Sequence, residues 1–432
     1  MNLGFSWINP RIKIILNSLL DIFIVFLYFS FYGLFSIEST PISVFLLLIA
    51  FLFISYILGR YSITGEIKTK FIIGVIYKSL LSVVVFSIFC NLFNKIYFKD
   101  FFSYKIYLDL YLLILGNQLI INFIIKFLYL DYSYLVFFFK CKKETFNSLE
   151  KYNLPKEILR KIIPFDKKID YEKYKKDYKL LFFSDSIDKL NGYSKFKFKK
   201  LNFWCERYLQ RLIVDFLEED DFGNFIKLRN SKLFHYFLKR LADIFFSILL
   251  LVITSPIIFI ISLIIIIENK GPVFYTQYRN GLNGNKFKIV KIRTMINNAE
   301  KNSSVWSEPN DKRITYLGKY LRKFRIDELP QLINVINGDM SLIGPRPERP
   351  DIDQKLAEKI PFYQYRYKIT PGLSGWAQVN YPYGASLNDS KNKLSYDLYY
   401  LKNFSIWFDM LIFFKTIRLL IFAKGAIAKI NK

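Results

Sequence analysis

Histidine and cysteine are scarce in this chain of 432 residues. It has one histidine, His235, and three isolated cysteines, Cys90, Cys141 and Cys205. A lone histidine argues against imidazole-based catalytic triads. It also argues against zinc sites of the H-E-x-x-H type, because such a site needs two histidines. Three separated cysteines argue against a disulfide framework and against a Cys-x-x-Cys metal site. Any catalysis would therefore have to come from carboxylates and cations.

Glycine is also missing from one long stretch, residues 135–176. The surrounding residues 131–235 are polar, with short apolar runs at 134–139, 179–183 and 196–204 and a helix-like stretch at 142–161. Short strands that alternate with helical patterns predict a reduced, Rossmann-like α/β domain with a parallel sheet, placed in the cytoplasm. Without a Gly-rich turn this domain lacks the dinucleotide fingerprint, so we interpret it as a spacer or docking module.

Long apolar runs, in contrast, are abundant. The chain is 52% hydrophobic, and its mean hydropathy is +0.20. Four runs, 12–36, 41–59, 71–93 and 106–130, reach roughly the 20 residues that a helix needs to cross a bilayer, and predict a four-helix transmembrane domain in residues 1–130. Arg11 and Lys13 lie at the start of the first run and Arg60 follows the second, which favours a cytoplasmic location for both ends of this domain.

Polar residues interrupt these apolar runs. The first run contains Asn17 and Asp21, and the fourth contains Asn117 and Gln118. Such groups are costly in lipid, so they either line a lipid or polymer path or bond to neighbouring helices. Bonding between helices is the favoured interpretation, because no pair of them forms a recognisable relay.

The net charge is strongly positive, +26, from 62 Lys and Arg against 36 Asp and Glu. Such an excess fits nucleic acid, anionic lipid or phosphorylated substrates, and a general richness in lysine is the plainer alternative. Nucleic acid is disfavoured, because the chain is tethered to lipid and many basic residues lie among motifs suited to phosphate.

A fifth apolar segment, 241–267, contains Ser255 and Pro256 near its middle. Proline removes a helical hydrogen bond and bends the helix, so the segment could either cross the membrane or enter and return. Both flanks are basic, with Lys239 and Arg240 before and Lys270 and Arg279 after. The charge bias gives no reason to cross, and re-entry is the prediction.

Beyond residue 269 the pattern changes to motifs rich in Gly, Pro and paired charges. A hairpin-like Asn-Gly-Asn at 283–285 precedes Lys286–Met295, where cationic and apolar residues alternate as in a half-buried strand. Asp327 and Glu328 then stand together among basic residues. A carboxylate pair can hold Mg²⁺ or attack phosphorus, and arginines grip phosphate, so phosphoryl chemistry at a membrane surface is favoured. Surface salt bridges are the alternative explanation of such a pair.

Residues 237–421 resemble the catalytic domain of the bacterial polyprenyl-phosphate sugar-phosphate transferases, the monotopic phosphoglycosyl transferase superfamily. The resemblance implies the long form of that family, with a mostly α-helical monotopic catalytic domain at 236–432 whose re-entrant helix, 241–267, breaks at Ser255 and Pro256. The motifs that carry it, in order, are K-R-L-A-D from Lys239, the Ser-Pro break, G-P-V-F from Gly271, K-I-R-T-M from Lys291, R-I-D-E-L-P-Q-L-I-N-V from Arg325, G-D-M-S-L-I-G-P-R-P from Gly338 and P-G-L-S-G-W-A-Q-V-N from Pro371.

The same resemblance implies roles for individual residues. Asp327 would be the nucleophile that forms a covalent phosphosugar intermediate, and Glu328 would help to hold Mg²⁺ and orient the pair. Asp339 would either reach the metal or cap a helix. The candidates for phosphate binding are Lys291, Arg293, Arg322, Arg325 and Arg346.

The implied reaction moves a sugar 1-phosphate from a nucleotide diphosphate sugar, expected to be a UDP-sugar, to undecaprenyl phosphate. It would yield undecaprenyl diphosphate sugar and a nucleoside monophosphate, as the first membrane step of exopolysaccharide, capsule or O-antigen synthesis. The implied location is the bacterial inner membrane, with the catalytic domain in the cytoplasm, and a homo-oligomer is possible. Neither the sugar nor the pathway follows from any motif.

One departure from the family pattern follows Asn380. Many members continue with Gly-Arg-Asn, whereas this chain reads Tyr-Pro-Tyr-Gly-Ala-Ser at 381–386, which removes one expected arginine. This variant resembles the subgroup associated with exosortase-type exopolysaccharide systems. It also leaves open a second function, a catalytically inactive membrane scaffold in a polysaccharide assembly complex.

Overall fold

The computed structural model describes residues 12–31, 41–61, 69–97, 104–128, 135–140, 162–164, 179–184, 198–217, 233–269, 271–296, 311, 313–381, 384 and 386–421. The chain divides into two compact units, Met1–Val136 with Asp170–Leu180 and Phe137–Ile169 with Leu181–Lys432. Each unit is described by itself below.

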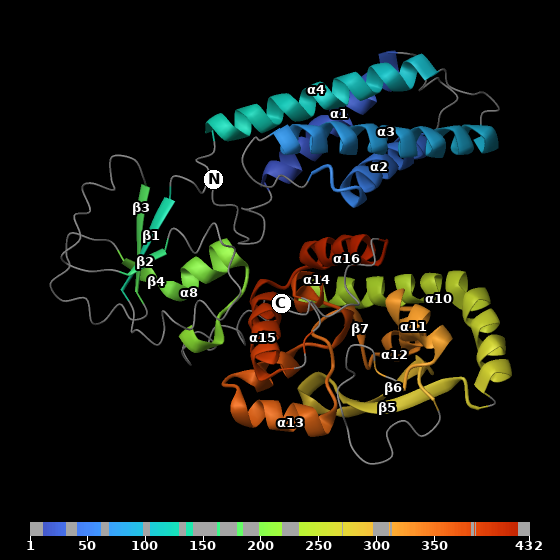
Figure 1. The fold of residues 1–432 in the computed structure, drawn as a ribbon, viewed down its shortest axis with the longest axis vertical. Helices are drawn as coiled ribbons and strands as arrows, with labels where there is room; N and C mark the ends of the chain where they lie inside the picture. Colours follow the sequence, from blue (N-terminus) through green and yellow to red (C-terminus); the bar gives the residue numbers. More distant parts are fainter. Residues whose placement is uncertain are drawn as a thin grey trace. The chain divides into compact units, whose positions relative to one another are not determined.

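Four helices make up most of the first unit: α1 (Ile12–Phe31), α2 (Pro41–Ile57), α3 (Thr69–Tyr97) and α4 (Tyr104–Leu128) (Figure 1). They share a buried core that includes Val25, Phe51, Phe86 and Leu110, while many of their other Leu, Ile and Phe side chains are exposed, as expected of helices that face lipid. Among the described residues, the stretch Ile73–Leu92 of α3 is long and apolar enough to cross a membrane, and the apolar stretches of the other three helices are shorter.

A buried polar network links these helices. The Arg60 guanidinium, just past α2, forms an ion pair with Asp21 of α1 and donates to Gln118 Oε1 of α4 at 2.7 Å. Asn117 donates to the other Asp21 oxygen at 2.8 Å. The predicted bonding between helices is thus confirmed for Asp21, Asn117 and Gln118.

A four-stranded sheet, in the order β2-β1-β3-β4, lies in the middle of the chain. Its strands are β1 (Leu135–Lys140), β2 (Ile162–Pro164), β3 (Lys179–Ser184) and β4 (Phe198–Lys200), and β1 pairs with β2, and β3 with β4, in parallel. The predicted strands at 134–139 and 179–183 are confirmed. In the run 196–204, the described residues form β4 at 198–200 and then α8 (Leu201–Trp204). The predicted helix at 142–161 lies outside the described residues, so the Rossmann-like fold stays a prediction.

Residues 205–216, here called the docking segment, follow α8 in the chain. They pack against the helices α14 (Trp376–Asn380) and α15 (Leu387–Asn403). The segment comprises the π-helix η3 (Cys205–Leu209) and the 3-10 turn η4 (Val214–Phe216). The Leu212 N–H donates to Ser395 O at 2.9 Å, and the Trp376 indole N–H donates to Gln210 O at 2.9 Å. Leu212 is fully buried, so the segment is an integral layer over α15.

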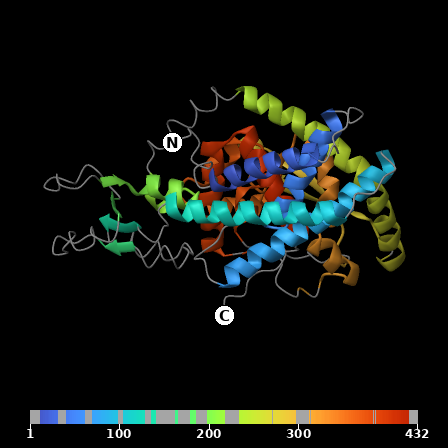
Figure 2. The same cartoon turned by 90° about the horizontal axis from the view of Figure 1, so that it is seen from above.

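The helix α10 (Leu233–Asn269) runs through the predicted re-entrant segment without interruption and contains Pro256. Its ribbon changes direction along its length in both Figure 1 and Figure 2. Pro256 has no N–H to offer the carbonyl of Val252, four residues back, and the Ser255 hydroxyl donates to that carbonyl instead, at 2.9 Å. The Ser255 hydroxyl thus satisfies the carbonyl that Pro256 leaves without its usual N–H donor, and a break of the helix at this pair stays a prediction.

Both ends of α10 pack against the same domain. Near its start, Arg240 donates to Val335 O at 2.6 Å and to Ile336 O at 2.7 Å. Near its end, Ile261 and Ile265 are buried in a cluster with residues of the strand β6 and the helix α11. The opposite side of α10 exposes a continuous series of apolar side chains, among them Phe245, Val252, Phe259 and Ile267.

The rest of this domain is built from short elements that pack around α10 (Figure 1). The predicted strand is confirmed as β6 (Lys286–Ile292), which pairs in antiparallel fashion with β5 (Phe274–Asn280). Asn283 and Gly284, both with positive φ, form the hairpin turn. The remaining elements, in chain order, are α11 (Tyr316–Lys323), η6 (Ile326–Gln331), α12 (Leu332–Asn337), β7 (Ser341–Ile343), α13 (Pro350–Lys359), η7 (Tyr363–Lys368), β8 (Gly372–Ser374) and α16 (Ile406–Ile421).

Candidate active site

The acid pair lies on η6, a 3-10 helix that follows directly after α11. Arg325, in the left-handed region at φ 60°, turns the chain between the two helices, and its carbonyl accepts the Glu328 N–H at 3.2 Å. This abrupt turn packs η6 against β6 and α10. As a result both carboxylates are buried, with Asp327 8% and Glu328 7% exposed.

Glu328 is held by three cations from three separate elements. Arg346, after β7, donates to both carboxylate oxygens, with NH1 3.3 Å from Oε2. Lys291 of β6 lies 3.5 Å from Oε1, and Arg325 lies 3.5 Å from Oε2. Burial alone would raise the pKa of Glu328, but Arg346, Lys291 and Arg325 outweigh it and hold the pKa well below its usual range. Glu328 therefore favours its ionised form and anchors the three cations around it.

Asp327 has the opposite environment. Its buried Oδ1 atom has no hydrogen-bond partner among the described residues. Burial, followed by the neighbouring Glu328 charge, raises the pKa of Asp327 to about 6, against the opposing pull of Lys291, Arg322 and Arg325. Two adjacent carboxylates thus receive different pKa values, and the one with the higher pKa keeps an oxygen open for chemistry.

Lys291 and Arg346 carry the positive charge that faces this pair. Burial lowers the pKa of Lys291 to about 8, although Glu328 favours its charged form. The Glu328 charge raises the pKa of Arg346 above its already high value. Asn334 of α12 keeps β6 in position, because its Nδ2 donates to Lys288 O at 2.8 Å and its Oδ1 accepts the Val290 N–H at 3.2 Å.

The other predicted residues lie around this centre. Arg322 donates to Thr294 Oγ1 at 2.8 Å, and its charge acts on Asp327. The Arg293 N–H donates to Val273 O at 2.8 Å. Asp339 accepts a hydrogen bond of 3.3 Å from Asn334. Roles for Arg293 in phosphate binding and for Asp339 in metal binding stay predictions.

Mg²⁺ prefers hard oxygen ligands such as carboxylates. The described part of the chain contains no group of three or more His, Cys, Asp or Glu residues suited to a metal. The open Oδ1 of Asp327 is nevertheless a hard oxygen ligand of the kind that Mg²⁺ prefers, and phosphate oxygens of a substrate would complete such a site. Glu328 could take part only by sharing its oxygens with the cations that hold it.

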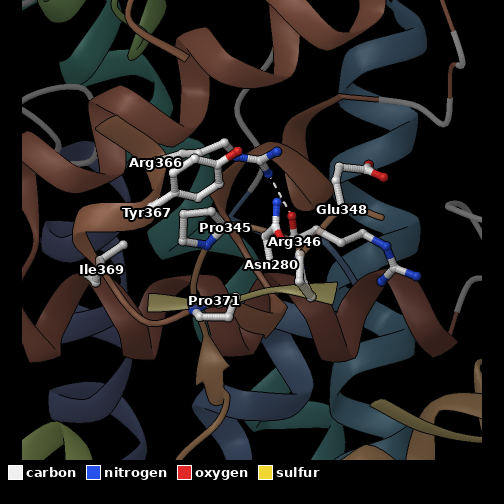
Figure 3. Close-up of a pocket in the computed structure, with 10 residues that line it drawn as sticks. Asn280, Pro345, Arg346, Glu348, Arg366, Tyr367, Ile369 and Pro371 are labelled. Carbon is white, nitrogen blue, oxygen red and sulfur yellow. Dashed lines mark hydrogen bonds between the residues drawn. The ribbon is translucent and has the colours of Figure 1, made fainter. Parts of the chain in front are cut away.

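Sequence reasoning missed Arg366, which lies on η7. It lines a pocket together with Asn280, Arg346, Glu348 and Tyr367, and its NH2 donates to the Arg346 main-chain carbonyl at 2.6 Å (Figure 3). No local signal marks it, because it stands in a run of tyrosines and lysines and its acidic partners come from distant parts of the chain.

The family model described as "Bacterial sugar transferase" matches residues 234–423. The chain is 42% identical over 216 residues to the UDP-N-acetylgalactosamine-undecaprenyl-phosphate N-acetylgalactosaminephosphotransferase of Aeromonas hydrophila, a match that covers half of each chain. It is 37% identical over 181 residues to the UDP-glucose:undecaprenyl-phosphate glucose-1-phosphate transferase of Caulobacter vibrioides, which covers 41% of this chain and 68% of that protein.

A third relative is the uncharacterized sugar transferase EpsL of Bacillus subtilis, 37% identical over 188 residues, which covers 44% of this chain and 89% of that protein. By contrast, the chain spans only about half the length of the Aeromonas relative, or less in the case of a Klebsiella pneumoniae glucose-1-phosphate transferase. The matched region contains η6, β6 and Arg346, and it begins at the start of α10. The chain belongs to the bacterial sugar transferase family.

Proposed function

We propose that this protein transfers a sugar 1-phosphate from a UDP-sugar to undecaprenyl phosphate and thereby initiates the synthesis of a bacterial surface polysaccharide. The observation that carries this proposal is the acid pair on η6, in which Glu328 is locked by three cations and Asp327 keeps one buried oxygen open. Related proteins whose names specify this reaction support it.

The first half-reaction would use Asp327 as the nucleophile. Its Oδ1 attacks the β-phosphorus of the UDP-sugar, an oxygen–phosphorus bond forms, and UMP leaves with the electron pair of the broken phosphoanhydride bond. An oxygen of undecaprenyl phosphate then attacks the phosphorus of the aspartyl phosphosugar. That step releases the Asp327 carboxylate and yields undecaprenyl diphosphate sugar.

The surrounding charges suit this sequence of steps. Arg346 and Lys291 are held beside the nucleophile, where they would stabilise negative charge that develops on phosphate oxygens. Glu328 balances these cations and fixes their positions. Mg²⁺, when bound beside Asp327, would neutralise the phosphates further.

For topology we propose a bacterial inner-membrane protein with four N-terminal transmembrane helices and a re-entrant α10, whose catalytic domain faces the cytoplasm. The contacts of both ends of α10 with one domain support re-entry, since a crossing helix would send its ends to opposite sides. Its exposed apolar side would lie in the lipid.

A direct test measures UMP release. The full-length protein is incubated with Mg²⁺, undecaprenyl phosphate and a panel of UDP-sugars, and at least one sugar should support turnover. Asp327→Asn should lower turnover by at least about 1,000-fold, because it removes the nucleophile. Asp351→Asn, at an exposed acid of α13, should leave turnover unchanged.

Two results would count against the proposal. Full turnover by Asp327→Asn would exclude this residue as the nucleophile. Absence of UMP release with every UDP-sugar, in a preparation that is folded, would favour the membrane scaffold over the enzyme.

A further inference from the structure

The main chain around Arg346 has few N–H groups that could donate hydrogen bonds. Pro345 and Pro347 flank it, and neither has a main-chain N–H to donate. This short stretch therefore depends largely on what its carbonyl oxygens accept. The position of this stretch matters, because the Arg346 guanidinium forms a bidentate hydrogen bond with the Glu328 carboxylate.

Each carbonyl from 345 to 348 has a separate partner. Main-chain N–H groups reach the first and the last: Gly372 N donates to Pro345 O at 2.8 Å, and Asn280 N donates to Glu348 O at 3.1 Å. Arginine side chains reach the two between. Arg366 donates to Arg346 O at 2.6 Å, and Arg279 donates to Pro347 O at 3.3 Å.

Arg366 makes the shorter of the two arginine contacts and binds at the residue that carries the functional side chain. Figure 3 shows its guanidinium turned towards the Arg346 carbonyl. The same guanidinium lies 3.3 Å from Asp397 of α15 and 3.7 Å from Asp353 of α13, and it donates to the Tyr363 hydroxyl. Arg366 is 9% exposed.

These partners indicate what Arg366 does. Two carboxylates already balance its charge, so it adds little to the binding of an anion. The Arg366 guanidinium instead links Asp353 of α13 and Asp397 of α15 to the Arg346 carbonyl. Such a link needs several donors in a fixed arrangement, which the planar guanidinium provides. The bond is thus suited to fixing the main chain at Arg346.

We propose that Arg366 is a positioning residue for sugar-phosphate transfer, which holds the Arg346 main chain so that the Arg346 guanidinium stays on Glu328 beside Asp327. This inference rests on the proposed function for its kinetic consequences. Its structural part, the restraint on residues 345–347, stands independently of any activity.

The kinetic test compares Arg366→Ala, Arg366→Lys, Arg346→Ala and the double variant Arg366→Ala with Arg346→Ala in the full-length protein. Arg366→Ala should lower kcat for UMP release by about 10- to 100-fold and change KM for the UDP-sugar less than about 3-fold, because it misplaces a catalytic cation. Arg366→Lys should recover part of the loss. The double variant should be no slower than Arg346→Ala alone, since Arg366 acts through Arg346.

The structural test measures hydrogen exchange by mass spectrometry in a peptide that spans 341–349. Exchange should be faster in Arg366→Ala and in Arg366→Lys than in the parent protein, and unchanged in Arg313→Lys, which alters an arginine bound locally to Asp311. Unchanged exchange in both Arg366 variants would overturn the proposal even for a protein that releases no UMP. Additive losses in the double variant would overturn it for an active one.

Discussion

At the scale of single residues, burial gives two adjacent carboxylates different chemistry. Asp327 and Glu328 differ by one methylene group and share one short helix, yet the pKa of Asp327 rises to about 6 while that of Glu328 falls. Burial favours a higher pKa for both groups, and their partners make the difference: Arg346 and Lys291 bond to Glu328, whereas one Asp327 oxygen has no hydrogen-bond partner among the described residues. A carboxylate with a pKa just below neutral is mostly ionised at physiological pH. It is also more basic, and so a better nucleophile, than a carboxylate of lower pKa.

This division predicts a bell-shaped pH profile for the kcat/KM of the UDP-sugar, measured as UMP release with undecaprenyl phosphate present. Asp327 must be ionised to attack, so activity should rise as pH increases through about 6. Lys291 must be protonated to stabilise phosphate, so activity should fall as pH increases beyond about 8. Glu328 adds no limb, because its low pKa keeps it ionised throughout.

Two lysine variants test whether Lys291 causes the fall in activity at high pH. Lys291→Arg should abolish it, since arginine stays charged, while the lower limb near 6 remains. Lys319→Arg, at an exposed position of α11, should keep both limbs. A parent profile that is flat between pH 5 and 7 would contradict the assignment of Asp327.

At the scale of elements, the docking segment covers the helix that supplies Asp397 to Arg366. Its Leu212, Ile213 and Val214 are almost completely buried. Ion pairs at both ends reinforce it, with Glu206 bound to Lys402 at 2.7 Å and Asp215 bound to Lys391. The segment lies before the predicted start of the catalytic domain at 236, yet it packs on that domain's helices, and the domain boundary itself stays a prediction.

Leu212→Ala should therefore destabilise the catalytic domain by about 2–5 kcal/mol, because it leaves a cavity between the segment and α15. The measurement is the Tm of the full-length protein in detergent, together with the rate of proteolysis within residues 387–403. Phe203→Ala, at an exposed side chain of α8, is the matched control and should change Tm little. Equal Tm values for the two variants would show that the segment does not support α15.

At the scale of the whole molecule, the chain contains two helical systems that expose many apolar side chains. The first unit is a bundle of four helices with a buried Arg60–Asp21 pair, and α10 is a single bent helix attached at both ends to one domain. The apolar outer side of α10 and the amphipathic α16, which exposes Trp407 and Ile421, would keep the acid pair close to a lipid-bound acceptor.

The proposed topology predicts the labelling of single cysteines introduced into a variant without the three native ones. Asn388→Cys, at an exposed position of α15, should not react with an impermeant maleimide in intact cells and should react in inverted membrane vesicles. Ser39→Cys should show the reverse pattern, because it lies between the first two apolar runs, which the predicted cytoplasmic ends of the four-helix domain place on the periplasmic side. Labelling of Asn388→Cys from outside intact cells would exclude a re-entrant α10.

The sequence by itself determined the helices of residues 1–130, the β5–β6 hairpin and the identity of the acid pair, because local periodicity, turn residues and short motifs encode each of them. It also predicted a phosphate-binding cluster, of which Lys291, Arg325 and Arg346 contact Glu328. The tertiary structure decided which carboxylate is anchored and which has an open oxygen. It also decided the role of Arg366, since its contacts with residues 346, 353 and 397 join segments that no local pattern connects.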